Sequence, residues 1–383
     1  MIVLINPEDS FLDETGGNKG DRAPLWAGSI SSYIKSKGYD VSIFDLNHDK
    51  RDEVLKFIED DQTKFVCISI STPNYEQCIE LSKVIKNEGR KIIAGGNHVT
   101  DFPDEKNTLE NFDHIIVGDG EETLLNIVEG REDRKIIYSE KIEPLNKLPH
   151  PDYEGLKFER YNLKVDGVPG AIVITSRGCT MGCCYCGSAK IKKWRSRTPE
   201  HVMEELRILY HKYNKRAFYF ADDIFTLSKA RVAKLSTMIK EEFPDVIWRA
   251  TTRADMLSDE LCKVMSESGC TWISLGIESG SDKVLKSMNK FMTVSQQKRG
   301  IDLCIKNGIS VKAFYLFPLP GEDKNTIQET INWTKEIKKE YGDKYKTDIY
   351  MLVPYYNTPL WNNPEKFGIE IYKTDNWKDY NQI

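Results

Sequence analysis

Short apolar, β-branched runs alternate with longer amphipathic stretches over the first 130 residues. The short runs predict strands at Ile2–Ile5, Val41–Phe44, Phe65–Ile70, Lys91–Ala94 and His114–Val117. The stretches between them are long enough for helices and lie at Leu25–Lys37, Arg51–Asp60, Tyr75–Asn87 and Glu121–Glu129. Because parallel strands need a long crossover, usually a helix, the pattern predicts a doubly wound α/β domain with a five-stranded parallel sheet over residues 1–140.

A second alternation of strands and helices follows a segment that is rich in proline. Residues 141–168, which include Pro144, Pro149 and Pro151, show no sustained period, as expected of a linker. Strand-like runs then begin near Ala171, Ala217, Ile247, Trp272, Val311 and Asp348. A closed eight-fold barrel takes about 250 residues. Six βα units within residues 169–360 therefore favour a partial (β/α)6 barrel of the TIM type, with a short tail at 361–383.

Composition and charge narrow the class of protein. The chain has 383 residues, of which 40% are apolar and 30% charged, as in globular proteins that bury large cores. Its apolar runs are too short to span a membrane, and no basic leader precedes the first one. The net charge is −11 over residues 1–150 and +6 over the rest, too diffuse to support nucleic-acid binding. Nine cysteines, an odd number, indicate a reducing compartment, so we expect a cytoplasmic protein.

Three cysteines lie close together after the first strand of the predicted barrel. Cys179-x3-Cys183-x2-Cys186 follows that strand at the end where barrel enzymes place their chemistry. Three thiolates on one loop can hold three irons of a cubane cluster and leave the fourth iron open. Structural zinc is the alternative, but zinc prefers four ligands in two pairs, and the sequence has no second CxxC or HxxxH pair. Cys184 is expected to point away from the other three.

This cysteine motif, with the aromatic Tyr185 before its last cysteine, resembles the signature of the radical S-adenosylmethionine (SAM) superfamily. Motifs at the ends of the next four strands resemble that family too: Phe220-Ala221-Asp222-Asp223, Arg253-Ala254-Asp255, Leu275-Gly276-Ile277-Glu278-Ser279-Gly280 and Leu319-Pro320-Gly321-Glu322. The resemblance implies that Cys179, Cys183 and Cys186 hold a [4Fe–4S] cluster. It also implies that the amine and carboxylate of SAM chelate the remaining iron.

Several polar residues at these strand ends are candidates for binding SAM. The amine and the ribose hydroxyls need acidic or hydroxyl partners, for which the candidates are Asp222, Asp223, Glu278 and Ser279. Arg253 is the candidate for the SAM carboxylate, and Tyr185 for contact with adenine. The alternatives are helix caps or solvated carboxylates for the acids, a surface salt bridge for Arg253 and plain packing for Tyr185.

Two glycine-rich turns follow the fourth and fifth strands of the first half. They are Gly95-Gly96-Asn97-His98 and Gly118-Asp119-Gly120-Glu121, and small residues there let a large ligand approach the backbone. Neither Gly-x-Gly-x-x-Gly after the first strand nor Gly-Lys-Ser/Thr anywhere is present, which disfavours dinucleotides and nucleoside triphosphates.

Placed before this barrel, the two turns resemble the cobalamin-binding domain of cobalamin-dependent radical SAM enzymes. That resemblance implies a Rossmann-like, flavodoxin-like domain that binds cobalamin. The candidates for cobalamin contacts are Gly95, Gly96, Asn97, Gly118, Gly120 and Glu121, with Ser71 and Thr72 on the loop after the third strand; strand-end capping is the alternative for the last two. The Asp-x-His-x-x-Gly motif that supplies a cobalt ligand in cobalamin mutases is absent, so His98 is interpreted as a turn or core residue.

Together the two halves predict a cobalamin-dependent radical SAM enzyme. The expected reaction is methylation of an unactivated carbon through a 5'-deoxyadenosyl radical and methylcobalamin. Cyclisation or rearrangement by the same family is the first alternative, and a non-catalytic cobalamin or iron–sulfur protein is the second. The expected partners are a small-molecule or peptide substrate and a reductant such as flavodoxin or ferredoxin.

Overall fold

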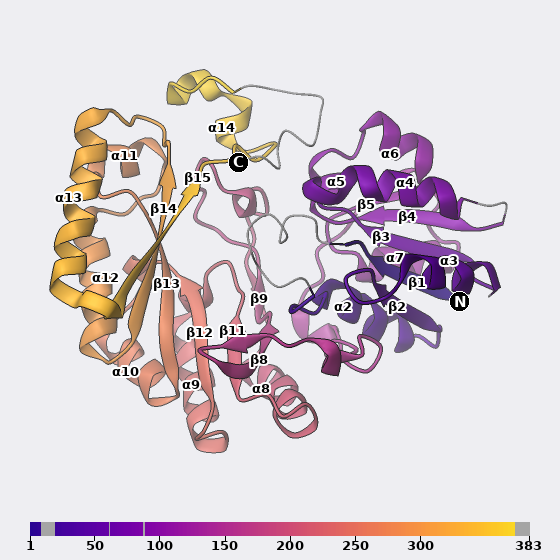
Figure 1. Cartoon of the computed structure of the whole chain (residues 1–383), viewed down its shortest axis with the longest axis horizontal. Coiled ribbons are helices and arrows are strands. Elements are labelled where there is room, and N and C mark those ends of the chain that lie inside the picture. Colours follow the sequence, from indigo (N-terminus) through magenta and orange to yellow (C-terminus); the bar gives the residue numbers. More distant parts are fainter. Residues whose placement is uncertain (9–19, 61, 87–88, 372–383) are drawn as a thin grey trace. The chain divides into compact units, whose positions relative to one another are not determined.

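The computed structural model describes residues 1–8, 20–60, 62–86 and 89–371 (Figure 1). The chain divides into two compact units, with the boundary between Asn162 and Leu163. None of the helices in the described part combines the length and the apolar character that crossing a membrane requires.

The first unit is built on a parallel sheet of six strands in the order β2-β1-β3-β4-β5-β6. These strands are β1 (Ile2–Asn6), β2 (Val41–Asp45), β3 (Phe65–Ser69), β4 (Lys91–Gly95), β5 (His114–Val117) and β6 (Ile136–Tyr138). The first five match the predicted strands to within a residue. The sixth, β6, is an addition to the predicted sheet, because three residues with only Ile137 buried give too short a pattern to detect.

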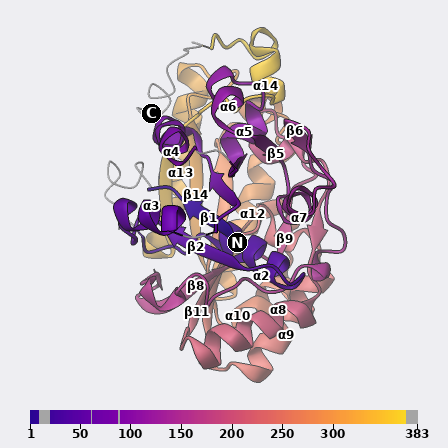
Figure 2. The same ribbon diagram turned by 90° about the vertical axis from the view of Figure 1, so that its right-hand side faces the viewer.

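Helices cover both faces of this sheet, as expected of a doubly wound fold. They are α2 (Leu25–Lys35), α3 (Arg51–Asp60), α4 (Tyr75–Ile85), α5 (Asn97–Asp101), α6 (Lys106–Asn111) and α7 (Glu121–Val128). Figure 2 shows the strands between α3 and α4 on one side and α2 and α7 on the other. The first four residues of β1, Ile2 to Ile5, are all buried, which happens only where both faces of a strand are covered.

The segment that follows the sixth strand packs against the first unit. The Tyr161 hydroxyl donates to Asp45 Oδ2 over 2.9 Å, and the Ser31 hydroxyl donates to Asp152 Oδ2 over 2.6 Å. Tyr153 and Leu156 of this segment are buried as well.

The second unit has a seven-stranded sheet in the order β15-β14-β13-β12-β11-β8-β7. Six of its strands are parallel: β8 (Val168–Val173), β11 (Ala217–Phe220), β12 (Ile247–Thr252), β13 (Cys270–Glu278), β14 (Ser310–Phe317) and β15 (Tyr345–Met351). The short β7 (Lys164–Val165) adds an antiparallel edge. Within the described residues, β7 and β15 do not pair with each other, so the sheet stays open, as predicted for a partial barrel.

Helices lie between successive parallel strands of the second unit: α8 (Pro199–Arg207), α9 (Lys229–Glu242), α10 (Asp259–Glu267), α11 (Asp282–Ser287), α12 (Val294–Lys306) and α13 (Lys324–Tyr341), with α14 (Pro359–Asn362) after β15. Side-chain caps begin several of them. Thr198 and Ser258, for example, accept hydrogen bonds from the backbone N–H three residues on. Phe218, Phe220 and Trp248 form part of the core between sheet and helices.

Candidate functional site

The three cysteines lie on a loop whose two ends are joined by a small hairpin. After β8, the strands β9 (Ser176–Arg177) and β10 (Arg195–Ser196) pair antiparallel and close the loop between them. Gly178 opens the loop with φ +91°, and a Cβ there would lie 2.2 Å from the carbonyl oxygen of Lys193. Only glycine permits this conformation and this close approach, so the local sequence fixes where the cysteines stand.

The donor set of this loop fits an iron–sulfur cluster. Cys179 and Cys183 are buried and Cys186 is partly buried, and none of the three forms a disulfide among the described residues. Within the described part of the chain, their sulfur atoms are not a group lying within 4.8 Å of one another. Tetrahedral zinc at Zn–S distances near 2.3 Å would bring its thiolates to about 3.8 Å. Three thiols on one loop can instead take three corners of a cubane.

Cys184, in the middle of the motif, has a different environment. Its side chain is buried in an apolar cluster with Val284, Leu285, Met288 and Leu360, among others. Its backbone N–H donates to the carbonyl oxygen of Met288, and its own carbonyl accepts from Leu360 N, each over 3.0 Å. Cys184 therefore anchors the loop to α11 and α14.

The two aspartates after β11 hold the backbone around this loop. Asp222 is buried and accepts from Thr175 N (2.7 Å), Thr175 Oγ1 (2.5 Å) and Ser176 Oγ (2.6 Å). Asp223 accepts from Gly178 N before the first cysteine (3.1 Å) and from Ser188 Oγ after the last (2.6 Å). Burial raises the pKa of Asp222, and its three hydrogen bonds oppose that rise. Both carboxylates are thus engaged by the chain itself, although each is a predicted ligand of SAM.

A buried ion pair lies at the end of β13. The Lys290 ammonium donates to Glu278 Oε1 over 2.9 Å, and both side chains are about a tenth exposed or less. Glu278 has a positive φ of 65°, and a Cβ on Gly276 would come within 2.6 Å of Glu278 Oε1. Glycine at 276 is therefore what leaves room for the pair. Lys290 was not predicted from the sequence, because it lies twelve residues beyond Glu278 with no local motif.

Tyr185 links this ion pair to the cysteines. Burial, together with the charges of Glu278, Cys183 and Cys186, raises the pKa of the phenol well above its usual value. The nearness of the phenol to the Glu278 carboxylate contributes to this rise of the pKa. Tyr185 is thus a neutral side chain of the cysteine loop that lies near Glu278.

Arg253, directly after β12, also reaches the cysteines. Its Nη1 lies 4.0 Å from Cys183 Sγ, while Nε and Nη2 donate to the two carboxylate oxygens of Asp255 over 3.0 and 2.9 Å. Burial opposes its charge, but the hydrogen bonds and charge of Asp255 outweigh that effect and raise the pKa of Arg253. The guanidinium is therefore a fixed cation beside the loop.

The structure separates Ser279 from this group. The Ser279 hydroxyl is buried and hydrogen-bonds to Thr330 Oγ1 over 3.0 Å and to Ser281 N over 3.2 Å. These partners lie on α13 and before α11, so Ser279 stabilises the turn that follows Glu278.

The glycines in the two turns of the first unit differ in their surroundings. Some face open space, and one packs tightly against neighbouring backbone. Gly95 would meet nothing within 4 Å if it had a Cβ, and Gly118 would meet only Ser139, at 3.5 Å. Gly96, with φ +99°, is different, since a Cβ there would lie 2.5 Å from the carbonyl oxygen of Ile70. The turn at Gly96 thus packs directly on the end of β3, while Asn97 is exposed beside it.

Polar candidates on this edge bind mostly to neighbours within the unit. Glu121 is buried and accepts from Ser29 Oγ over 2.8 Å, next to Gly120. Ser71 and Asn74 form a capping box at the start of a 3-10 turn, and Thr72 Oγ1 lies 3.2 Å from His98 Nδ1.

His98 is a core residue, as the sequence suggested. It is buried between the rings of Tyr75 and Phe102, with centroids 4.3 and 5.2 Å away. Burial lowers the pKa of His98 to about 3, so its imidazole is neutral.

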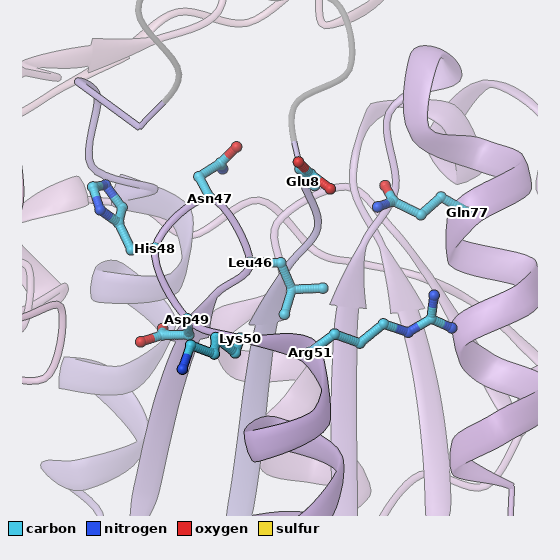
Figure 3. Close-up of a pocket in the computed structure, with 8 residues that line it drawn as sticks. All are labelled: Glu8, Leu46, Asn47, His48, Asp49, Lys50, Arg51 and Gln77. Atoms are coloured by element: carbon cyan, nitrogen blue, oxygen red, sulfur yellow. The ribbon is translucent and has the colours of Figure 1, made fainter.

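An open hollow of about 330 Å³ lies at the same carboxyl edge (Figure 3). Its lining is polar apart from one leucine and consists of Glu8, Leu46, Asn47, His48, Asp49, Lys50, Arg51 and Gln77. In Figure 3, Gln77 points from α4 toward Glu8, which follows β1. None of the predicted cobalamin contacts belongs to this lining.

Comparison with known proteins places each unit in a family. The B12 binding domain matches residues 18–128, and the radical SAM superfamily matches residues 173–334. The chain has the domain pair of a cobalamin-dependent radical SAM enzyme. This result confirms the predicted fold class, the enzyme class and the set of cofactors: a [4Fe–4S] cluster, SAM and cobalamin.

Two similar proteins carry names that denote different reactions. The chain is 29% identical over 408 residues to an uncharacterised methyltransferase from Pyrococcus horikoshii, a match that covers 100% of this chain and 86% of the relative. It is 25% identical to an anaerobic magnesium-protoporphyrin IX monomethyl ester cyclase from Rubrivivax gelatinosus, covering 83% of this chain and 62% of that protein.

Its fold is similar to that of the radical SAM methyltransferase TsrM from Kitasatospora setae, whose structure holds cobalamin and a [4Fe–4S] cluster. The TM-score is 0.76 over 94% of this chain and 73% of TsrM, at 16% sequence identity. At that identity, the likeness concerns the fold.

In this family setting, the cysteine loop is predicted to hold the cluster, and the glycine-rich edge of the first unit is predicted to hold the corrinoid. The assignment of individual residues to SAM and cobalamin stays a prediction.

Proposed function

We propose that this protein transfers a methyl group from SAM to an unactivated carbon of its substrate. The observation that carries the proposal is the occurrence, in one chain, of a three-cysteine loop suited to a cubane and a separate B12 binding unit. When bound, these cofactors supply a one-electron cleavage of SAM and a cobalt centre able to carry a methyl group. The methyltransferase names of the Pyrococcus relative and of TsrM support this reaction.

The residues of the second unit have distinct roles in the proposal. Cys179, Cys183 and Cys186 hold the cluster, while Asp222 and Asp223 fix the backbone of their loop. Lys290 offers the SAM carboxylate a buried cation, and Glu278 offers the amine or a ribose hydroxyl an acceptor, because the two groups already stand side by side next to Tyr185.

The residues of the first unit accommodate the corrinoid. Gly95 and Gly118 expose backbone where a wide ring can approach, and Asn97, Ser71 and Thr72 supply polar groups beside it. A Cβ on Gly120 would lie 3.0 Å from Ile30 Cδ1, so glycine at 120 lets its turn pack on α2. Gly96 and Glu121 stabilise the two glycine-rich turns through their contacts with Ile70 and Ser29.

Ring formation is the second candidate reaction, favoured by the likeness to the Rubrivivax cyclase. It would use the same cofactors with a substrate whose carbon radical closes on itself. For either reaction we propose a small-molecule or peptide substrate, a flavodoxin or ferredoxin as reductant, and a cytoplasmic setting.

Isotope labelling distinguishes these reactions. The holoenzyme, reconstituted without oxygen, is incubated with reductant and SAM that carries a labelled methyl group. Methyl transfer predicts label in the extracted corrinoid and formation of 5'-deoxyadenosine, whereas 5'-deoxyadenosine without label in the corrinoid would favour cyclisation. Cys183→Ala should abolish the formation of 5'-deoxyadenosine, and Cys184→Ala should preserve it. A protein with an intact cluster that forms neither 5'-deoxyadenosine nor labelled corrinoid would contradict both reactions.

A further inference from the structure

The edge of the Arg253 guanidinium that could bind the carboxylate of SAM is already occupied by the carboxylate of Asp255. A guanidinium has five N–H groups. The single N–H of Nε is directed to Asp255 Oδ1, and Nη2 donates both to Asp255 Oδ2 and to the carbonyl oxygen of Lys290, over 2.9 Å each. Only Nη1 remains for another partner, and the atom it faces is Cys183 Sγ at 4.0 Å.

The position of Asp255 makes the arrangement directional. Its carboxylate binds the Nε–Nη2 edge of the guanidinium, which is the edge away from Nη1. The positive end of the Arg253–Asp255 pair is therefore turned to Cys183. Because Arg253 is 5% exposed, water screens little of this interaction.

A cation and an N–H donor beside a cluster thiolate affect the two redox states differently. Reduction adds one electron to the cluster and makes its sulfur ligands more negative. Hydrogen bonds to those sulfurs, and nearby positive charge, stabilise the reduced state and raise the reduction potential. Arg253 forms no bond and loses no proton in this step; the electron comes from the protein's reductant.

We propose that Arg253 sets the reduction potential of the cluster through Cys183, with Asp255 as the residue that positions it, and that Lys290 is the cation that receives the SAM carboxylate. The inference rests on the proposed cluster site. It changes the role expected for Arg253 from the sequence, where it was the candidate for the carboxylate itself.

The first test compares Arg253→Gln with the unaltered protein, both reconstituted without oxygen and without SAM. The midpoint potential is measured by a redox titration followed by electron paramagnetic resonance. We expect the ratio of reduced to oxidised cluster at a fixed potential to fall about tenfold, a shift of about 59 mV to more negative values for a one-electron couple. The dissociation constant of SAM should change less than twofold.

The matched control is Arg249→Gln. Arg249 lies on β12, the strand that Arg253 directly follows, and it also binds a carboxylate, Asp166, through two nitrogens. It has no contact with the cysteines among the hydrogen bonds of the described residues. The midpoint potential of the cluster in Arg249→Gln should equal that in the unaltered protein.

The opposite outcome for Arg253→Gln is equally clear. An unchanged potential with a SAM dissociation constant raised tenfold or more would overturn the inference and return Arg253 to the carboxylate. If the unaltered protein held no cluster after reconstitution, that result would instead contradict the proposed function.

A second measurement looks for Arg253 directly in the unaltered protein, and a variant serves only to assign the signal. Protein enriched with ¹⁵N-arginine is reduced without SAM, and pulsed electron paramagnetic resonance is used to search for a weak coupling between the cluster and nitrogen. The inference predicts a coupling that disappears in Arg253→Lys; a reduced cluster with no arginine coupling would overturn it.

Discussion

The carboxyl ends of the strands carry different kinds of residues in the two units, charged side chains in the second and glycines in the first. In the second unit, charged side chains bind one another and the backbone around the cysteine loop, as Asp222 does with three hydrogen bonds. In the first unit, glycines leave the backbone accessible, as at Gly95, where a Cβ would meet nothing. A cluster held by three covalent bonds needs its ligands fixed in advance, whereas a wide corrinoid needs free space along the backbone.

This contrast predicts that side-chain changes matter most in the second unit and that added atoms matter most in the first. The largest effect is expected for the cluster ligands. Cys179→Ala should reduce bound iron from about four per chain to near zero after reconstitution. Cys184→Ala should keep its iron, because its side chain packs among apolar residues. Equal iron losses in both variants, measured by elemental analysis, would argue against the assigned ligands.

The next largest effect is expected at the tight turn of the first unit. Gly96→Ala places a Cβ 2.5 Å from a backbone oxygen at a positive φ, which should destabilise the protein by about 3 kcal/mol or more. Gly38→Ala is the control, because Gly38 also has a positive φ (+87°) but open space around it, and should cost about 1 kcal/mol. Urea unfolding of the two variants measures the difference, and similar midpoints would mean that the contact with Ile70 is unimportant.

A smaller loss of stability is expected for the buried aspartate. Asp222→Ala leaves Thr175 N and two hydroxyls without their acceptor and should cost about 2–3 kcal/mol. Asp223→Ala, which removes two less buried bonds, should cost about 1 kcal/mol. Thermal unfolding under nitrogen tests this order, and a larger loss for Asp223 would reverse our view of which acid supports the loop.

The smallest effect concerns SAM affinity. Lys290→Met should raise the dissociation constant of SAM about tenfold, or about 1.4 kcal/mol, with the cluster retained. Lys283→Met removes a lysine that pairs with Asp323 on the surface and should leave the affinity unchanged. Isothermal titration of both variants measures the difference, and an unchanged affinity for Lys290→Met would exclude it as the carboxylate partner.

Sequence patterns predicted the features that depend on nearby residues. The strands followed from runs of apolar residues, and the cluster loop followed from the spacing of Cys179, Cys183 and Cys186. The Lys290–Glu278 pair could not be predicted, because it depends on a positive φ at Glu278 and on the space left by Gly276. Likewise, Ser279 adjoins Glu278 in sequence, but its hydroxyl binds Thr330 on α13, a contact that only the tertiary structure creates.

The central claim is that one chain holds both a cubane on its cysteine loop and a corrinoid on its glycine-rich edge. Elemental analysis of protein purified and reconstituted without oxygen tests this claim most directly. We predict about four irons, about four acid-labile sulfides and about one cobalt per chain. Zinc in place of iron, or full iron with no cobalt after incubation with excess cobalamin, would contradict it.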